Sequence, residues 1–557
     1  MGVDSVVESI SWERVHLSLI VRLDVTHAEG EPAIAPERVT YRLQAARAGY
    51  PVPTTYLGEG RHRLNLTITD FANRRPIPDG AWRLIAQYDG TDLSAARLPL
   101  DQVDALDDHS RQFLYLQNTE AYSVTFGITE ADVRPEFVMR TYRFFRNPVV
   151  ADVGSLKGLA ATVVKRGLRA ARDPRPVGYT IRFLSKLMRR VMGSPGNRIL
   201  FASEMRPRIE GNLLQVRDRM IERGLDARYD FTYSFRLPES SSTLGTLRLI
   251  YRLSTADIIL VDDYFGVLEY LYVPDHVKVI QLWHAGVGFK SIGYSRFGKY
   301  GSPKLHNAHR RYTYAIAGSA ELKSVYAEAF GIEEAAIVPT GLPRIDTFLD
   351  PELAAAAVRR FHEQHPDLAG KRIILFAPTF RGRGIRDAYY DYDQLDFERM
   401  YRLCGDDTVV LFRMHHFVAD PPPIPDEFCD RLIDAAEFGD TNDLLQVADI
   451  LITDYSSVIY EYSLLRRPML FFAYDREVYA ATRGFHHDFE DTAPGKVCDT
   501  FDELLDAIER QDFELGKIDE FVAHNFDHVD TGSTDRVIDW LILGDPPRDQ
   551  PTLPSAQ

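Results

Sequence analysis

Polar side chains suited to phosphate chemistry follow five short apolar runs of the chain. The runs cover residues 277–281, 337–339, 373–377, 409–412 and 450–453, and the residues after them include His284, Arg344, Thr379, Phe380, Arg381, Arg413, His415, Ser456 and Ser457. If each run is a parallel strand, these side chains meet at the carboxyl edge of a sheet, where α/β proteins bind ligands. Arginine, histidine and hydroxyl groups with few carboxylates suit two linked phosphates. The spacing therefore predicts a site for a nucleotide diphosphate ester.

The turn Asp454-Tyr455-Ser456-Ser457 is the most compact of these stretches. Ser456 or Ser457 is expected to cap a helix over residues 458–465. The start of such a helix offers free N–H groups and the positive end of the helix dipole to a phosphate. Serine is also a preferred N-cap in any helix, so the turn alone leaves a plain cap equally open. The other four strand ends favour the phosphate site.

His284 is the candidate for proton transfer. An imidazole with a pKa near neutrality, placed just after a strand, suits a general base, although a core or capping role is the commoner fate of a single histidine. His415-His416 and His486-His487 lack acid or cysteine partners at ligand spacing, so no metal site is expected. No dinucleotide fingerprint and no P-loop motif occurs, so the sequence gives little support to a dinucleotide-dependent redox enzyme or a P-loop NTPase.

Alternating strands and helices must position these residues. Strands are expected at 199–201, 258–261, 277–281 and 314–317, and again at 373–377, 409–412, 450–453 and 469–473. Two consecutive βα series predict an α/β protein with two Rossmann-like domains that face a cleft, over residues 197–365 and 366–544. The Pro-rich tail, residues 545–557, is expected to be disordered.

The first 147 residues show a different pattern, in which apolar and polar residues alternate. Val15, Leu17, Leu19, Val21, Leu23 and Val25 form the clearest example. Period-two alternation with turn signals between runs predicts an all-β, sandwich-like accessory domain. Its role stays open between a carbohydrate- or partner-binding module and a structural appendage.

Residues 148–196 form a basic segment in an otherwise acidic chain. Between residues 156 and 190, ten Lys and Arg residues face one acid, Asp173, whereas the whole chain has a net charge of -16. Interleaved apolar residues predict amphipathic helices for an anionic membrane surface, and a linker helix packed on its neighbour is the alternative. The acidic balance argues against nucleic-acid binding. No secretory signal, no apolar run of about 20 residues and only three cysteines occur, which fits a soluble or peripheral protein of a reducing compartment.

Six motifs, in order, resemble the CDP-glycerol glycerophosphotransferase family. They are Trp283-His284, Thr340-Gly341-Leu342-Pro343-Arg344, Ala377-Pro378-Thr379-Phe380-Arg381, Arg413-Met414-His415, Ile452-Thr453-Asp454-Tyr455-Ser456-Ser457 and Arg483-Gly484-Phe485. The resemblance spans residues 197–543. It implies a GT-B fold with the N-terminal half on the acceptor side and the C-terminal half on the donor side. It also implies a peripheral position on the cytoplasmic face of the cell membrane.

The resemblance implies residue roles as well. His284 is similar to the catalytic base of the family, and His415 is assigned to the catalytic residues with it. The implied donor-binding residues are Ala285, Gly286, Arg344, Thr379, Phe380, Arg381, Arg413, Ser456, Ser457 and Glu461. The chain departs from the family at Glu461, where Asp is frequent, and at Ala285-Gly286-Val287, where many members have Gly-Thr-Pro. The second departure leaves the choice of polyol open.

The implied function is transfer of glycerol phosphate, or another polyol phosphate, from CDP-glycerol to a hydroxyl group of a membrane-linked acceptor. CMP is released, and the product is a teichoic-acid-like or capsular polymer. The implied partners are the CDP-polyol, a lipid-linked polymer acceptor and an anionic membrane surface, without a cofactor. One alternative is a GT-B glycosyltransferase or epimerase that uses a UDP-sugar. A second alternative is a non-catalytic, membrane-bound, glycan-binding scaffold.

Overall fold

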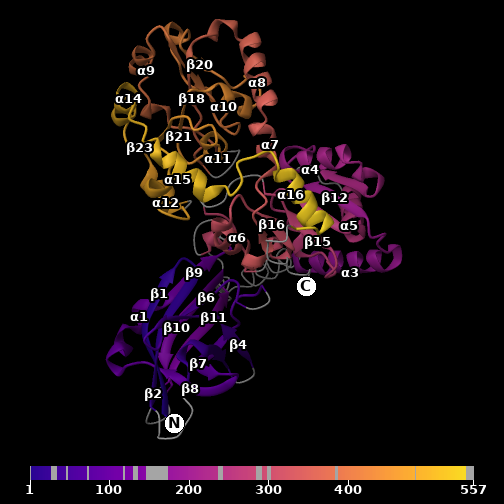
Figure 1. Cartoon of the computed structure of the whole chain (residues 1–557), viewed down its shortest axis with the longest axis vertical. Helices are drawn as coiled ribbons and strands as arrows, with labels where there is room; N and C mark the ends of the chain where they lie inside the picture. The colour runs from indigo at the N-terminus through magenta and orange to yellow at the C-terminus, as the bar shows by residue number, and fades with distance from the viewer. Residues whose placement is uncertain are drawn as a thin grey trace, which may run out of the picture. The chain divides into compact units, whose positions relative to one another are not determined.

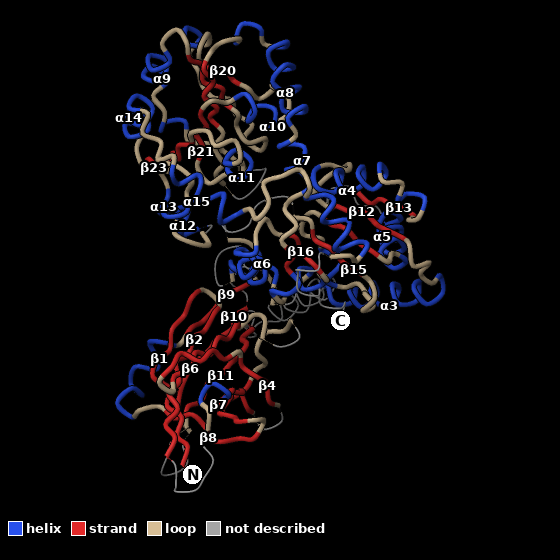
Figure 2. The backbone as a smooth tube through the Cα atoms, in the orientation of Figure 1, coloured by secondary structure: helices blue, strands red, loops and turns tan. Residues whose placement is uncertain are grey.

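The computed structural model describes residues 2–26, 34–45, 48–71, 74–116, 120–129, 136–145, 174–235, 243–283, 291–297, 303–305, 307–382, 387–482 and 485–546 (Figure 1). The chain folds into two compact units. The first comprises Met1–Tyr179, Ile292–Arg310 and Glu328–Glu333, and the second comprises Thr180–Ser291, Arg311–Ala327 and Glu334–Gln557. Strands dominate the first unit, whereas strands and helices alternate in the second (Figure 2).

The first unit is a β structure, as the alternating pattern predicts. Its described strands are β1 (Gly2–Glu13), β2 (His16–Thr26), β3 (Val39–Gln44), β4 (Gly49–Val52), β5 (Thr54–Gly58), β6 (Arg61–Thr67), β7 (Gly80–Tyr88), β8 (Thr91–Arg97), β9 (Arg111–Tyr115), β10 (Glu120–Ile128) and β11 (Phe137–Phe145), with a short helix α1 (Leu106–His109). Leu17, Leu19, Val21 and Leu23 of β2 are buried. Successive strand side chains point to opposite faces, so this spacing places all four in the core.

The strands of the first unit belong to one hydrogen-bonded sheet. Its order is β5-β6-β2-β1-β8-β7-β11-β10-β9, with β3 and β4 attached beside β7. Because β7 pairs with β8, the two layers expected for a sandwich are joined through these strands. Neighbouring strands pair antiparallel except for β1 and β8, which pair parallel.

Two segments from later in the chain complete the first unit. Phe297 and Leu305 lie in its hydrophobic core, and the Phe297 ring lies 5.3 Å from that of Tyr115. The buried carboxylate of Glu328 accepts hydrogen bonds from Arg14 at 2.9 Å and pairs with His16 at 2.6 Å. Residues expected in the first Rossmann-like domain therefore belong to the β unit, and the unit is not a contiguous stretch 1–147.

The second unit begins with a six-stranded parallel sheet of order β13-β12-β14-β15-β16-β17. Its strands are β12 (Arg198–Ser203), β13 (Asp230–Phe235), β14 (Ile258–Val261), β15 (Lys278–Gln281), β16 (Tyr314–Ile316) and β17 (Ile337–Val338). The described helices of this half are α3 (Pro174–Met192), α4 (Gly211–Glu222), α5 (Thr243–Thr255), α6 (Lys323–Phe330), α7 (Pro343–Leu349) and α8 (Pro351–Gln364).

A second six-stranded parallel sheet follows, with the order β20-β19-β18-β21-β22-β23. Its strands are β18 (Arg372–Phe376), β19 (Thr408–Phe412), β20 (Leu432–Asp434), β21 (Ile450–Thr453), β22 (Met469–Phe472) and β23 (Lys496–Cys498). Its described helices are α9 (Phe397–Cys404), α10 (Thr441–Val447), α11 (Ile459–Ser463), α12 (Arg476–Thr482), α13 (Phe489–Thr492), α14 (Phe501–Arg510) and α15 (Gly516–Asn525). The strand order reverses between β18 and β21, and ligands bind outside the carboxyl ends of strands at such a switch point.

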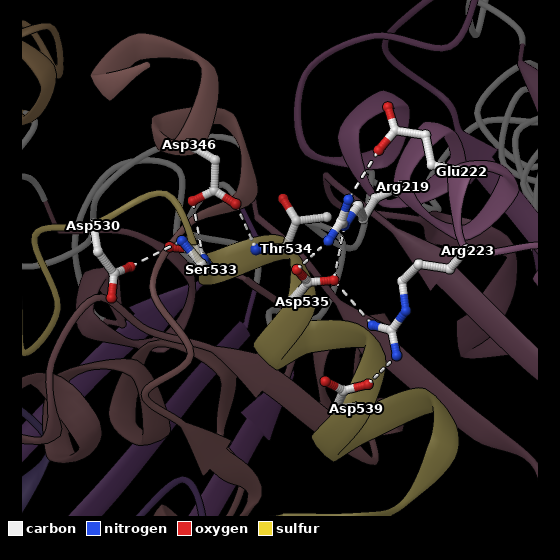
Figure 3. A network of polar contacts seen from close by, with 10 residues as sticks. Arg219, Glu222, Arg223, Asp346, Asp530, Ser533, Thr534, Asp535 and Asp539 are labelled. Carbon is white, nitrogen blue, oxygen red and sulfur yellow. Dashed lines mark hydrogen bonds and ion pairs between the residues drawn. The ribbon is translucent and has the colours of Figure 1, made fainter. Parts of the chain in front are cut away.

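The chain then returns to the first half through α16 (Ser533–Arg536), which continues as a π-helix over Val537–Leu543. Figure 3 shows Asp346 of α7 accepting hydrogen bonds from the amides of Ser533 and Thr534, at 3.0 and 2.7 Å. Arg219 of α4 and Arg223, which directly follows this helix, pair with Asp535 at 2.8 and 2.9 Å. The end of the predicted donor half thus packs on helices of the other half.

Helix α3 makes up most of the described part of the basic segment, residues 174–196. Residues 148–173 and the expected disordered tail beyond residue 546 lie outside the described residues. Among the residues that the structure describes, no helix combines the length and hydrophobicity needed to cross a bilayer.

Candidate active site

Asp454 lies at the switch point of the second sheet, directly after β21, and its side chain is buried. Its Oδ1 accepts hydrogen bonds from the Thr379 amide at 2.8 Å and the Thr379 hydroxyl at 2.9 Å. Its Oδ2 accepts a hydrogen bond from Nη1 of Arg381 at 2.9 Å. Because Thr379 follows β18, these bonds join the ends of the two strands between which the order reverses.

Arg381 is buried between two carboxylates. Besides Asp454, it binds Asp475 with Nε at 2.6 Å and with Nη2 at 2.8 Å. Burial alone would lower the pKa of Arg381, but Asp454 and Asp475 outweigh it and raise that pKa. All three of its guanidinium nitrogens bind protein groups, and the expected contact of Arg381 with a donor stays a prediction. The Thr379 hydroxyl binds Asp454, and its expected contact with a donor likewise stays a prediction.

A cavity of about 410 Å³ opens over the carboxyl ends of β18, β19 and β21. Its walls bring together three of the residues expected at the site, namely Arg413, His415 and Ser456. Pockets that hold small molecules usually measure about 300–1,000 Å³. The other lining residues include Ala377, Pro378, Met414, His416, Asp434, Glu437, Thr441 and Val458.

His415 presents a defined ring nitrogen in this cavity. The Phe417 amide donates a hydrogen bond to its Nδ1 at 3.2 Å, so the neutral ring carries its proton on Nε2. Its ring lies 4.8 Å from that of Phe380 and 4.4 Å from that of His416. Burial, and secondly the charge of Arg413, lower the pKa of His416. The lowered pKa favours the neutral form of His416 beside the permanent cation of Arg413.

Arg413 also shapes the cavity wall. Its guanidinium donates hydrogen bonds to the carbonyl oxygens of Ala435 at 2.8 Å and Gly439 at 2.9 Å, and to that of Ala436. These carbonyls belong to the loop between β20 and α10. Arg413 holds that loop in place and adds positive charge to the wall.

The serines of the Asp454 turn do not form the expected N-cap. Helix α11 begins at Ile459 and ends at Ser463, and no side chain caps its start. Ser456 Oγ accepts a long hydrogen bond, 3.5 Å, from the Val458 amide. Ser456 lines the cavity, whereas Ser457 is not among its lining residues.

Arg344 and Glu461 pair with each other across the two halves of the second unit. The Arg344 guanidinium, on α7, forms an ion pair with the Glu461 carboxylate on α11. Burial raises the pKa of Glu461, and the charge of Arg344 opposes that rise. Neither side chain lines the cavity that holds Arg413 and His415.

Three expected residues, His284, Ala285 and Gly286, lie outside the described residues. The structure describes the chain up to Trp283, whose φ angle of 24° falls in the left-handed region. Among the described residues, no group of three or more His, Cys, Asp or Glu side chains could hold a metal ion.

Sequence reasoning missed Asp475 and Asn212. Asp475 follows β22 at the same sheet edge as the expected residues, so the strand-end rule could have found it. Asn212 is the second residue of α4, shortly after β12, and its residue type and position carry no signal for this chemistry.

Comparison with known proteins identifies the family to which the chain belongs. Residues 184–543 match the family model described as CDP-Glycerol:Poly(glycerophosphate) glycerophosphotransferase. Teichoic acid ribitol-phosphate polymerase TarL of Staphylococcus aureus is 40% identical over 347 residues, which is 62% of each chain. A teichoic acid poly(ribitol-phosphate) polymerase of Bacillus spizizenii is 31% identical over 496 residues, covering 88% of this chain and 79% of that one.

A solved structure shares the fold. The wall teichoic acid polymerase TagF superposes with a TM-score of 0.53 at 21% identity, over 69% of this chain and 97% of that one. The present chain spans less than two thirds of the length of the Staphylococcus aureus relative.

Proposed function

Because the chain belongs to the CDP-glycerol:poly(glycerophosphate) glycerophosphotransferase family, we propose that it transfers a polyol phosphate from a CDP-polyol to an acceptor hydroxyl. CMP is the second product, and the polymer is a teichoic acid or a related surface polymer. The observation that carries this proposal is the cavity at the switch point of the second sheet. Its wall combines a fixed guanidinium, an imidazole N–H and a hydroxyl, groups that suit a pyrophosphate.

The proposed reaction is an in-line displacement at the phosphorus that bears the polyol. His284 removes the proton of the acceptor hydroxyl, and the resulting oxygen attacks that phosphorus. The bond to the bridging oxygen breaks, and CMP leaves with that oxygen. The Nε2–H of His415 and the charge of Arg413 stabilise the negative charge that develops on the phosphate oxygens. In phosphoryl transfer, positioning and electrostatic stabilisation supply most of catalysis.

Between glycerol and ribitol, the similarities favour ribitol phosphate as the transferred unit. Both relatives described above are named as polymerases of ribitol phosphate. The acceptor is proposed to be a lipid-linked polymer, at the cytoplasmic face of the membrane.

Exposed residues of α3 support membrane association. Tyr179, Phe183, Leu187 and Val191 recur every fourth residue and are 73, 67, 45 and 70% exposed. This spacing aligns them on one helix face. The basic residues Arg182, Lys186 and Arg190 are also exposed. Arg189, on the opposite side, donates hydrogen bonds to Ser254 O and Ala256 O, at 3.1 and 2.6 Å.

An exposed apolar stripe with flanking cations suits the headgroup region of an anionic bilayer. The inner face of α3 is attached to the second unit, as a packed linker helix would be. We therefore propose that the helix binds the membrane with its outer face.

A donor panel tests the proposed function. The purified protein is incubated with a prepared polymer acceptor and with CDP-ribitol, CDP-glycerol or a UDP-sugar, and the released nucleotide is measured. CMP release from CDP-ribitol, with lengthening of the acceptor, is the expected result. Release of UDP instead would establish the glycosyltransferase or epimerase alternative, and no turnover of any donor would favour the scaffold.

A second arm tests the base. His284→Ala is expected to abolish CMP release while the melting temperature stays unchanged. Near-normal turnover by this variant would remove the assignment of His284.

A further inference from the structure

The side chain of Asn212 joins three segments of the first half. Asn212 is the second residue of α4 and is 2% exposed. Its Nδ2 donates hydrogen bonds to Leu282 O at 2.6 Å and to Trp283 O at 2.7 Å. Its Oδ1 accepts a hydrogen bond from the Arg344 amide at 2.8 Å. One amide group therefore contacts the chain just before residue 284 and the start of α7.

The contact with two successive carbonyls depends on a turn at Trp283. In an extended strand, consecutive carbonyl groups point to opposite sides. Here both oxygens approach one nitrogen, and the φ angle of 24° at Trp283 supplies the change in direction. The Trp283 amide donates a hydrogen bond to Oε1 of Gln281 at 2.9 Å. A bulky residue rarely adopts this conformation, so the two N–H groups of Asn212 stabilise it.

The contact with Arg344 fixes the start of α7. Pro343 is the first residue of this helix and has no N–H, so the Arg344 amide is the first of the helix N–H groups that lack an internal partner. Leu342 precedes the helix without a capping side chain. Asn212 therefore caps α7 from another helix and sets the direction in which Arg344 leaves the backbone.

We propose that Asn212 is a positioning residue for the transfer reaction, an inference that rests on the proposed function. Its side chain fixes the backbone of Leu282 and Trp283, which precedes His284, relative to the backbone of Arg344. Asparagine suits this role because its amide supplies two donors and an acceptor at one position. Aspartate keeps the acceptor and loses the donors, and alanine loses both.

The two substitutions should therefore affect the kinetics differently. Asn212→Asp brings a carboxylate against two carbonyl oxygens while it retains the bond to Arg344. Its kcat for CMP release is expected to fall about 100-fold, because small displacements of reacting groups cost this much, and its KM for the CDP-polyol should change less than about threefold. Asn212→Ala should lower kcat and also raise KM.

The pH profile separates positioning from a loss of folding. Carbonyl oxygens nearby raise the pKa of a buried carboxyl group, and the protonated group can donate one hydrogen bond. The rate of Asn212→Asp relative to the wild type should therefore rise as the pH falls from 8 toward about 6. Asn525→Asp is the matched control, since Asn525 is buried and donates to Phe521 O at 2.8 Å. Its kcat should stay within about twofold at every pH.

Site-resolved hydrogen exchange tests the inference without turnover. The Arg344 amide should stay protected in Asn212→Asp and lose protection in Asn212→Ala, while the Trp283 amide should exchange faster in both. This result would support the inference even if the wild type used no CDP-polyol. Unchanged exchange at both amides, or a uniform increase over the whole second unit with a pH-independent loss of activity, would overturn it.

Discussion

Asp454 precedes Ser456 of the cavity wall by two residues, and Arg381 compensates the charge of its carboxylate. Asp454 and Asp475 together place two negative charges near a site proposed for a pyrophosphate, and like charges there would repel the donor. The guanidinium of Arg381 pairs with both carboxylates, so the three side chains together carry one net negative charge. Arg381 thus supports the site through its carboxylate partners.

Replacing Arg381 should therefore destabilise the second unit. In Arg381→Gln, two carboxylates lose their buried partner, and removing one member of a buried ion pair costs about 3–5 kcal/mol of unfolding free energy. Urea denaturation followed by circular dichroism measures the change. Arg431→Gln is the control, because Arg431 pairs with Asp406, whose side chain is 92% exposed, and such pairs contribute at most about 1 kcal/mol.

The same comparison distinguishes the two roles of Arg381. If Arg381→Gln is as stable as Arg431→Gln but binds a CDP-polyol much more weakly, Arg381 contacts the donor directly. The expected outcome is instead that Arg381→Gln loses much more unfolding free energy than Arg431→Gln.

Residue types after strands predicted which side chains gather at one edge of the sheet, and their roles stay predictions. Arg413, His415 and Ser456 do line one cavity, because parallel strands end at the same sheet edge. The contacts of Arg381 could not be predicted in this way. Its partner Asp475 lies 94 residues along the chain, and a sequence pattern does not show which acid a guanidinium will meet.

At the scale of elements, helix α3 carries a test of membrane association. Replacing Arg182, Lys186 and Arg190 together with Gln should weaken binding to vesicles with anionic lipid. Each basic residue near such a surface contributes about 1 kcal/mol, so the partition constant should fall about 100-fold. Vesicle flotation at low salt measures it.

The control for α3 makes the same charge change elsewhere. Arg399, Arg402 and Arg510, on α9 and α14, are 45, 69 and 76% exposed and are each replaced with Gln. Equal losses in the two triple variants would indicate non-specific charge attraction. Unchanged flotation of the α3 variant would favour a linker role for the helix.

The ion pairs of α16 make its docking sensitive to acid. The hydrogen bond from Arg536 lowers the pKa of Asp530 to about 2, and that from Arg219 lowers the pKa of Asp535. Folded-state values below the ordinary 3.8 mean that this stabilisation is complete above about pH 4 and is lost as the pH falls toward 2. Hydrogen exchange over residues 533–543 should therefore accelerate below pH 4.

A variant separates this effect from general acid unfolding. Asp535→Asn should raise exchange over residues 533–543 at pH 7 and flatten its increase at acid pH. A steep acid response in the variant, equal to that of the wild type, would contradict the role of Asp535.

The elements themselves were largely predictable. The predicted strands 258–261 and 450–453 have the observed bounds, because continuous apolar runs are typical of buried parallel strands. The helix expected over 458–465 covers only Ile459–Ser463. A serine in the sequence indicates a helix cap, but it does not show at which residue the backbone enters the helix. Here the N-cap position is occupied by Val458, which has a helical conformation.

For the whole molecule, the boundaries of the units could not be read from local patterns. Residues 292–310 follow a strand of the first parallel sheet yet belong to the β unit, since Phe297 and Leu305 are buried in its core. Periodicity shows which face of an element is apolar, but it does not show which unit covers that face. The β unit thus depends on residues from the half that carries Arg344.

This dependence predicts that the β unit is not a removable module. Phe297 is 5% exposed and its ring lies 5.4 Å from that of Phe113. In the full chain, Phe297→Ala should cost about 3–5 kcal/mol in the unfolding of the first unit, as is usual for a buried phenylalanine. Differential scanning calorimetry should show one transition at lower temperature. Phe183→Ala, at a position 67% exposed, should shift neither transition.

Deletion of residues 1–147 gives the stronger test of the same dependence. The shortened chain would expose Phe297 and Leu305 to water and would remove Arg14 and His16 from the carboxylate of Glu328. Exposed apolar residues and a charge left without its partners favour aggregation, so the shortened chain is expected to be insoluble and inactive. A soluble shortened chain with full CMP release would contradict this dependence. It would show that the β unit is an accessory domain that the rest of the chain does not need.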